Sequence, residues 1–188
     1  MNESTDAETA AASTTKATAT TKATAATAAQ DTGSARPGRG AEYAPSPSAR
    51  VRDQVALYEA TAGVEGAEQG GLPVIILTTT GARTGKTRKN PIMRVEQDGV
   101  YAAIASYAGK PENPQWYYNL LAQPYATVQD GRQVRRVRAR EVFDEEKQGW
   151  WAVADALNPN YARYRATAGG RDIPILALEP ADWADEVG

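Results

Sequence analysis

Residues 73–90 read PVIILTTTGARTGKTRKN, and the fold expected for this chain follows from them. The segment 73–80 carries aliphatic and β-branched side chains without a charge, which predicts a buried strand. Gly81 and Gly85 then allow the backbone to turn sharply. An extended pattern from about Lys89 to Glu96 predicts a second strand after the turn.

The turn is strongly basic. Every charged side chain from Gly81 to Arg94 is an arginine or a lysine. Successive backbone N–H groups in such a turn can face an anion, and arginine matches the geometry of a phosphate or carboxylate. The turn is therefore predicted to cradle the anionic part of a phosphorylated cofactor. A solvated basic hairpin is the plainer interpretation, and the turn alone does not separate the two.

Gly85-Lys86-Thr87 resembles the end of the phosphate-binding loop of nucleotide hydrolases, but its spacing does not fit. The motif G-x-x-x-x-G-K requires a glycine where this chain has Thr80. That loop also leads into a helix, whereas Asn90-Pro91 and an extended pattern follow here. Nucleotide hydrolysis is therefore not expected.

The remaining pattern predicts an antiparallel protein with helices added late in the chain. Asp98-Gly99 and Asp130-Gly131 indicate tight hairpin turns. Further strands are expected at about 100–106, 125–129, 134–142 and 173–178, and helices at about 51–58, 114–122, 144–157 and 161–166. Asn113 and Asp144 are expected to cap two of these helices. Strands and helices do not alternate as in a parallel sheet, so we expect an α+β, mainly β fold: a small barrel with peripheral helices.

The composition removes several classes of chemistry. The 188 residues include no cysteine and no histidine, which excludes disulfides, thiolate catalysis, a Ser-His-Asp triad and histidine-ligated metal centres. A Ser-Lys pair or an all-carboxylate metal site stays open on composition alone. Demanding chemistry would then come from a bound cofactor. The formal net charge of −2 favours no nucleic-acid partner.

The chain divides into two regions of different composition. Residues 1–36 consist largely of Ala and Thr, and Pro37 to Pro47 is punctuated by proline and glycine. Such a segment buries too little apolar area to become ordered, so 1–47 is predicted to be a disordered tail and linker, and 48–188 one domain. No apolar run approaches the roughly 20 residues that span a bilayer. A cytoplasmic protein is expected, and peripheral contact with the inner face of the cell membrane stays compatible with the sequence.

Together, the motifs resemble those of the deazaflavin-dependent nitroreductase family, which includes quinone reductases that use reduced coenzyme F420, an 8-hydroxy-5-deazaflavin. The resemblance spans roughly residues 58–180 and rests on Thr78–Gly81, Arg83–Gly85, Arg88, Asn90-Pro91, Ala105-Ser106, Ala108-Gly109, Asn113-Pro114, Trp116-Tyr117, Asn119-Leu120, Pro159, Tyr161, Tyr164 and Ile173–Ile175. It implies a split β-barrel of the FMN-binding and pyridoxamine-phosphate-oxidase type. It also implies hydride transfer from reduced F420 to a quinone, a nitroaromatic compound or a similar electron-poor acceptor.

The resemblance further implies which residues form the site. Arg83 and Arg88 would hold the phosphate and acidic tail of F420, and residues 89–93 would line its ring through backbone contacts. The cofactor-binding residues implied are Arg83, Thr84, Lys86, Arg88, Lys89, Asn90, Pro91, Ile92, Met93, Ile104, Ala105, Ser106, Tyr107, Gln115, Trp116, Tyr117, Asn119 and Tyr161. Ser106, Tyr161 and Tyr164 are implied as catalytic residues that donate a proton or a hydrogen bond, with a solvent proton as the alternative. No metal ligand is implied.

Three positions depart from the family pattern. Ala82 and Tyr107 stand where a basic residue is usual, and Lys86, Lys89 and Lys110 are candidates to compensate. Asn158 stands where an aromatic residue of the pocket is usual. Two other functions stay open: an FMN- or haem-binding protein on the same barrel, and a non-enzymatic cofactor carrier. The sequence indicates neither the physiological acceptor nor the oligomeric state.

Overall fold

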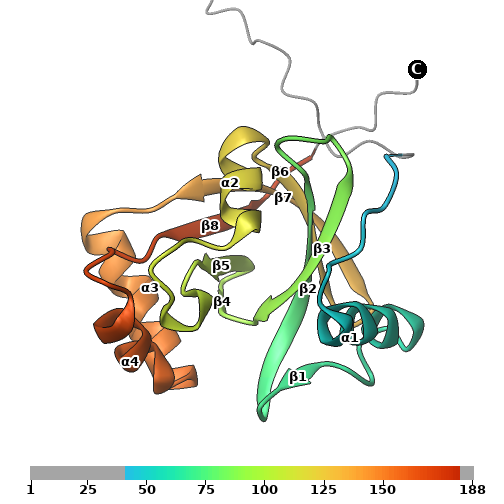
Figure 1. Ribbon diagram of the computed structural model, residues 1–188. Coiled ribbons are helices and arrows are strands. Elements are labelled where there is room, and N and C mark those ends of the chain that lie inside the picture. Colours follow the sequence, from blue (N-terminus) through green and yellow to red (C-terminus); the bar gives the residue numbers. More distant parts are fainter. Residues whose placement is uncertain (1–40, 183–188) are drawn as a thin grey trace, which may run out of the picture. The chain divides into compact units, whose positions relative to one another are not determined.

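The strand predicted at 73–80 is present as β2, Leu72–Thr80, in the computed structural model, which describes residues 41–182 (Figure 1). The other strands are β1 Glu68–Gln69, β3 Thr87–Met93, β4 Glu96–Gln97, β5 Val100–Ile104, β6 Tyr125–Asp130, β7 Gln133–Glu141 and β8 Ile175–Pro180. The helices are α1 Ala49–Ala60, α2 Gln115–Ala122, α3 Asp144–Leu157 and α4 Asn160–Thr167, with a short 3₁₀ helix, η1, at Tyr107–Gly109. The first 40 residues of the predicted tail lie outside the described range. Between residues 41 and 182, no helix has the length and apolar character needed to cross a membrane.

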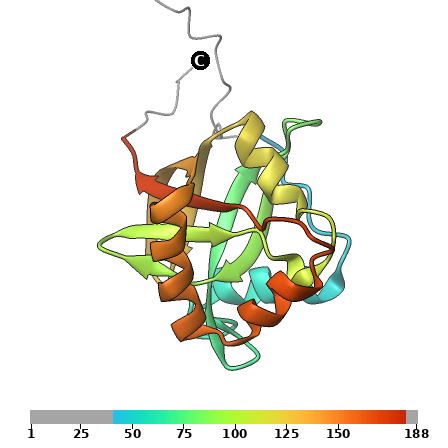
Figure 2. The same cartoon turned by 90° about the vertical axis from the view of Figure 1, so that its left-hand side faces the viewer.

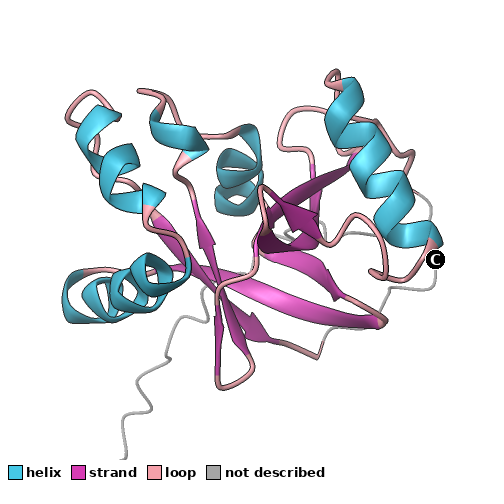
Figure 3. Cartoon of the chain, turned by 90° about the horizontal axis from the view of Figure 1, so that it is seen from below, coloured by secondary structure: helices cyan, strands magenta, loops and turns pink. Residues whose placement is uncertain are grey.

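The strands pair antiparallel in one curled sheet. Their order is β1-β2-β6-β7-β8-β5-β4, and β3 pairs with β2 in addition, so that β2 is flanked by β3 and β6. The helices lie around this sheet, as the colouring by secondary structure makes clear (Figure 3). The arrangement confirms the predicted fold class, a split β-barrel with peripheral helices.

Alternate side chains of β2 point into two separate cores. Ile75 and Leu77 join the core that α2 helps to cover, whereas Val74 and Ile76 pack against the buried face of α1. Burying one such side chain contributes about 1.5–3 kcal/mol. The uncharged run 74–77 in the sequence therefore reflects a strand that is covered on both faces.

The closing strand β8 shows the same two-sided burial. Leu176 and Leu178 face the core that contains β2, and Ile175 and Ala177 face α3 and α4. Figure 2, which looks at the left-hand side of Figure 1, shows α3 and α4 in front of the sheet. Helix α1 lies at the opposite side in Figure 1, beside β2 and β3.

One predicted strand is divided in two. The pattern at 89–96 belongs to β3, which ends at Met93, and to β4, which begins at Glu96. The N–H of Arg94 makes one further bond to β2, at the carbonyl of Pro73 (2.8 Å), and its Nε donates to Asp130 (2.8 Å), after which the chain bends into β4. The hairpin predicted at Asp98-Gly99 is confirmed, and it joins β4 to β5.

Both predicted helix caps are wrong in detail. Pro114, not Asn113, occupies the N-cap position of α2, and the Asn113 side chain accepts a hydrogen bond from Arg171 instead. Asp144 is the first residue of α3, with a positive φ of 48°, and Phe143 precedes it without a side-chain cap. Asn113 fails as a cap because a distant cation competes for its oxygen.

The segment after β5 adopts an unusual backbone that shapes the site. Tyr107, Ala108 and Gly109 all have positive φ, at 46°, 54° and 80°. Positive φ is unfavourable for residues with a Cβ and needs support from surrounding contacts. At Gly109 glycine suits the positive φ, and it also leaves room for α4, because a Cβ there would collide with Thr167.

Arg171, between α4 and β8, holds this segment in place. Its guanidinium donates to the carbonyls of Ala105 (3.1 Å), Ser106 (3.2 Å) and Lys110 (3.0 Å), and to Oδ1 of Asn113. Hydrogen bonds from a charged donor are stronger than those between neutral groups. Arg171 therefore stabilises a conformation that the local sequence does not favour.

Arg171→Met should loosen this segment, because four acceptor atoms lose their charged donor. We expect the free energy of unfolding to fall by about 2–4 kcal/mol, measured by urea denaturation, and amide exchange at Gly109 and Lys110 to become faster. Arg132→Met, at an exposed position in the β6–β7 turn, is the matched control and should leave both quantities unchanged. Equal behaviour of the two variants would show that Arg171 does not hold the segment.

Candidate functional site

A basic groove of about 950 Å³ lies between the turn after β2, the start of α2 and the segment that leads into α1. Its cationic lining side chains are Arg50, Arg83, Arg88, Lys89 and Lys110, and no acidic side chain lines it. The first turn of α2 also borders the groove, and a helix N-terminus favours negative charge. The groove therefore suits an anionic ligand.

Residues 41–47, which the sequence assigned to the linker, lie along β3 and contribute to this groove. Tyr43 forms a parallel bridge with Thr87. The N–H of Thr87 donates to the carbonyl of Glu42, and its carbonyl accepts from the N–H of Ala44, both at 3.0 Å. Arg88 donates to the carbonyl of Ala44 (3.2 Å). Strand β3 thus holds residues 42–44 in place, and the segment 44–47 forms one wall of the groove.

Two lysines of the basic turn and strand are already paired within the protein. Lys86 contacts Glu42 at 2.9 Å, and Lys89 contacts Glu59 at 2.6 Å. Exposed ion pairs of this kind add little stability, yet each glutamate offsets the charge of its lysine. Arg83, which is exposed, contacts no carboxylate among residues 41–182, so it contributes an uncompensated charge.

Four backbone N–H groups of the turn that was predicted to cradle an anion are hydrogen-bonded within the protein. The N–H groups of Thr84 and Gly85 donate to the carbonyl of Gly81 (3.2 and 2.8 Å), and Gly81 donates across the turn to the carbonyl of Lys86 (2.8 Å). The N–H of Ala82 donates to a side chain of α2 (3.1 Å). The reversal between β2 and β3 needs these hydrogen bonds to close. Anion binding here therefore depends on side chains.

Asn119 is the α2 residue that ties the helix to this turn. Its Oδ1 accepts from the N–H of Ala82 (3.1 Å), and its Nδ2 donates to Oγ1 of Thr79 (3.1 Å). Both ends of the buried amide are used in this way. Asn119 lines the groove, but its contacts show that it positions the basic turn.

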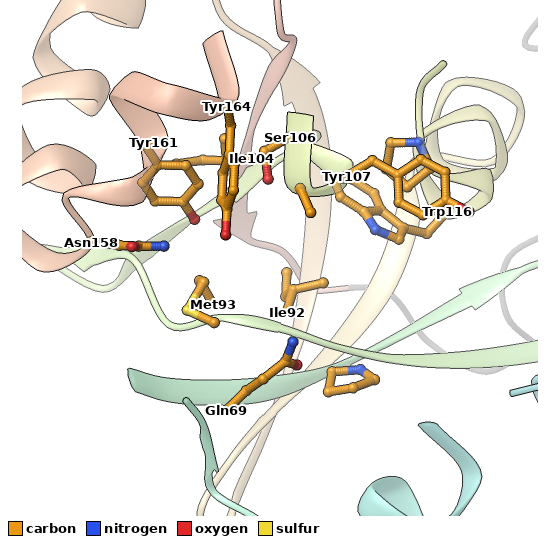
Figure 4. Close-up of a pocket in the computed structure, with 13 residues that line it drawn as sticks. Gln69, Ile92, Met93, Ile104, Ser106, Tyr107, Trp116, Asn158, Tyr161 and Tyr164 are labelled. Carbon is orange, nitrogen blue, oxygen red and sulfur yellow. The ribbon is translucent and has the colours of Figure 1, made fainter. Parts of the chain in front are cut away.

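The inner pocket is a second, smaller cavity of about 250 Å³ (Figure 4). No charged side chain lines it. Figure 4 shows Ile92 and Met93 on one side, and the hydroxyls of Ser106, Tyr161 and Tyr164 turned toward the cavity from the other. An apolar cavity with a few hydroxyl donors suits a flat, uncharged ring.

The groove and the inner pocket adjoin each other. Pro91, Tyr107, Pro114 and Trp116 line both cavities. Trp116 also belongs to the core beneath α2, so it lines the cavities and packs in the core at the same time. Pro91 is tolerated in β3 because, within residues 41–182, β2 is the only strand that pairs with β3 there. The two cavities together fit a ligand with a flat ring at one end and anionic groups at the other.

Tyr161 is the most deeply buried of the hydroxyl-bearing residues in the pocket. Its ring packs edge-to-face against Trp151 (centroids 5.7 Å apart) and Tyr164 (6.0 Å). Burial, with smaller contributions from Tyr164 and Asp155, raises the pKa of Tyr161 far above its ordinary value. Its phenol therefore stays neutral at physiological pH and can donate a hydrogen bond into the pocket.

The structure brings most of the implied site residues to one of the two cavities. The groove is lined by Arg83, Thr84, Arg88, Lys89, Asn90, Gln115 and Asn119, the inner pocket by Ile92, Met93, Ile104, Ser106, Tyr161 and Tyr164, and both by Pro91, Tyr107 and Trp116. Lys86, Ala105 and Tyr117 line neither cavity. Tyr117 is a core residue whose hydroxyl donates to Glu141 (3.1 Å), and burial beside this carboxylate raises the pKa of Tyr117 to about 12.

Several lining residues were not among those implied by the sequence. Gln69 and Asn158 line the inner pocket, and Arg50 and Lys110 line the groove. Gln69 lies in a two-residue strand that no periodicity indicates. Asn158 and Lys110 were noted in the sequence only as a departure at a pocket position and as a compensating cation, and the structure places both in a lining.

Comparison with known proteins agrees with this geometry. Residues 50–180 match the family model described as F420H(2)-dependent quinone reductase. The F420H(2)-dependent quinone reductase Rv1261c of Mycobacterium tuberculosis is 32% identical over 127 residues, which cover 65% of this chain and 85% of that protein.

Two solved structures are also similar. An F420-H2 dependent reductase, FDR-A, is 44% identical, with a TM-score of 0.54 over 57% of this chain and 94% of its own. A chain described as a domain-swapped dimer is 40% identical, with a TM-score of 0.57 over 68% of this chain and 92% of its own. The chain belongs to the F420H(2)-dependent quinone reductase family and is an oxidoreductase whose cofactor is coenzyme F420.

Proposed function

We propose that the protein reduces a quinone with reduced F420, and that nitroaromatic compounds and similar electron-poor molecules serve as alternative acceptors. The groove would hold the phosphate and acidic tail of F420, and the inner pocket would hold its ring together with the acceptor. Residues 48–188 would form the cofactor-binding domain. The cytoplasmic location, a peripheral contact with the membrane and the disorder of residues 1–40 stay predictions, whereas residues 41–47 lie along β3 and are not a disordered linker.

One observation carries this proposal: a groove lined by cations opens onto a pocket lined by no charged residue. A ligand with anionic groups at one end gains from the groove, because bidentate arginine contacts match phosphate and carboxylate. A flat ring gains from leaving water for the inner pocket. The reactive end is thereby held away from the charges that fix the tail.

When bound, reduced F420 supplies a hydride. The residues of this chain would hold the cofactor ring and the acceptor in place and provide a pocket with little water. Ile92, Met93 and Ile104 give the inner pocket an apolar lining that disfavours water, and Trp116 lines both cavities where they meet. Holding two reactants in a fixed geometry can by itself lower a barrier by several kcal/mol.

The hydroxyls of the inner pocket would act on the acceptor. Ser106, Tyr161 and Tyr164 turn toward the cavity in Figure 4. Among the described residues, none of these hydroxyls donates a hydrogen bond to another residue, so each is available to an acceptor oxygen. Reduction of a quinone leaves negative charge on that oxygen, and a neutral phenol stabilises it by hydrogen bonding or by giving it a proton.

The direct experiment titrates the purified protein with reduced F420, FMN and haem, and then adds menadione. We expect tight binding of reduced F420 and its oxidation by menadione, followed by absorbance. Tight binding of FMN or haem without binding of F420 would replace this proposal by the alternative cofactor. Binding of F420 without turnover with menadione or a nitroimidazole would favour a cofactor carrier.

Replacing Arg83 and Arg88 together by alanine should weaken F420 binding by about 2 kcal/mol, the scale of charge-assisted hydrogen bonds. This corresponds to about a 30-fold increase in Kd, which fluorescence titration would measure. Arg132→Ala with Arg138→Ala, two exposed arginines outside both cavities, removes the same charge and should change Kd little. An equal loss in both double variants would mean that net charge, and not the groove, attracts the cofactor.

Tyr161→Phe should slow menadione reduction about tenfold, the effect of one hydrogen bond of about 1.4 kcal/mol in the transition state. Because the pKa of Tyr161 is raised, its phenol stays protonated between pH 6 and 9, and the ratio of the two rates should be constant over that range. Tyr118→Phe, at an exposed position of α2, is the control and should match the unmodified protein. A ratio that falls as pH rises would show that Tyr161 loses its proton in this range, contrary to this account.

A further inference from the structure

Asn158 is a buried amide at one end of the inner pocket. It follows α3 and precedes α4, its side chain is 4% exposed, and it lines the cavity. In Figure 4 its amide group extends toward the space bounded by Met93 and the hydroxyls of Tyr161 and Tyr164. No part of the mechanism described above uses this group.

The direction of the amide is fixed by its contacts. The backbone N–H of Asn160 donates to Oδ1 of Asn158 at 3.1 Å, and Nδ2 of Asn160 donates to the same oxygen at 3.0 Å. A backbone N–H can only donate, so the atom that faces it must be the oxygen. The nitrogen, Nδ2, is therefore the atom that faces the pocket.

The backbone of Asn158 is held as firmly as its side chain. Its N–H donates to the carbonyl of Ala154 (2.9 Å), and its carbonyl accepts from the N–H of Tyr161 (3.1 Å). The amide is thus placed by two helices at once and does not rotate freely. A donor that is held in position loses little entropy when a ligand arrives.

Among residues 41–182, Nδ2 of Asn158 donates no hydrogen bond to another residue. It faces the cavity, so it is a positioned donor that is open to a ligand. A ligand oxygen at this end of the pocket would satisfy it. Among residues 41–182, no charged side chain lines the pocket, which favours a flat, largely apolar molecule.

We propose that Nδ2 of Asn158 donates a hydrogen bond to an oxygen of the electron acceptor and selects acceptors that carry a carbonyl or nitro oxygen at this position. The proposal rests on the proposed quinone reduction. In that reaction the acceptor gains a hydride, which brings two electrons and one hydrogen, and its oxygen takes the negative charge until a proton arrives from a hydroxyl or from water. A fixed N–H donor stabilises this charge more than it stabilises the neutral carbonyl. Asn158 thereby determines specificity through the transition state.

The test compares two acceptors with each variant. Menadione has carbonyl oxygens, and the phenazine methosulfate cation has none. Asn158→Asp keeps the oxygen that accepts from Asn160 but replaces the donor by an acceptor. We expect kcat/KM for menadione to fall about 10- to 100-fold, the scale of one lost oxyanion donor, with kcat/KM for phenazine methosulfate and the Kd for F420 unchanged.

Two further variants make the result independent of folding and of added charge. Asn158→Leu removes the donor without introducing charge and should show the same selective loss for menadione, even if Asn158→Asp does not fold. Asn160→Ala removes one contact to Oδ1 but keeps the backbone N–H and Nδ2 of Asn158, and should behave as the unmodified protein.

Three results would contradict the proposal, and the two acceptors distinguish them. Equal losses for both acceptors, or a weaker Kd for F420, would show that Asn158 shapes the site in general. Unchanged kinetics in both Asn158 variants would show that its amide does not meet the acceptor. An unmodified protein that oxidises reduced F420 with phenazine methosulfate but not with menadione would overturn the proposed quinone reduction and, with it, this role.

Discussion

The pairing of β2 with β3 is the interaction on which the site depends. Its register places Thr80 opposite Thr87, which closes the basic turn, and Ile75 opposite Ile92, which sets the wall of the inner pocket. A slip by one residue would turn every side chain of β3 to the other face. The cores on the two faces of the sheet oppose such a slip, because Ile92 and Met93, which pack against different cores, would then exchange environments. Both cavities therefore keep their shape only while β2 and β3 stay paired in this register.

This strand pair also explains how charge and apolar surface are kept apart. The first residues of β3 carry the cations of the groove, and its last residues, Ile92 and Met93, face the inner pocket. One extended segment thus runs from a wet, charged region to a dry one. The segment after β5 forms the facing wall, and Arg171 stabilises its unfavourable backbone through contacts with residues 105–113. A ligand that spans both cavities would meet both kinds of surface at once.

The local patterns predicted the parts of the fold that depend on neighbours in sequence. The uncharged run 74–77 and the turns at Asp98-Gly99 and Asp130-Gly131 indicated strands and hairpins correctly. The failures come from contacts between distant residues. Asn113 lost its capping role to Arg171, 58 positions away, and the turn lost a free N–H group to Asn119 of α2. The family resemblance marked Asn158 as a pocket position, but the direction of its amide becomes visible only when the neighbours of that amide are known.

The central claim is that one ligand spans the basic groove and the uncharged inner pocket. The most direct test compares the Kd of intact F420 with that of the same deazaflavin lacking its phosphate and acidic tail, at about 0.01 M and 1 M salt, where the screening length falls from about 30 to 3 Å. The account predicts that intact F420 binds more tightly at low salt and that this advantage shrinks at high salt. It also predicts that binding of the truncated ring hardly depends on salt. Equal affinities for the two compounds at low salt would contradict it.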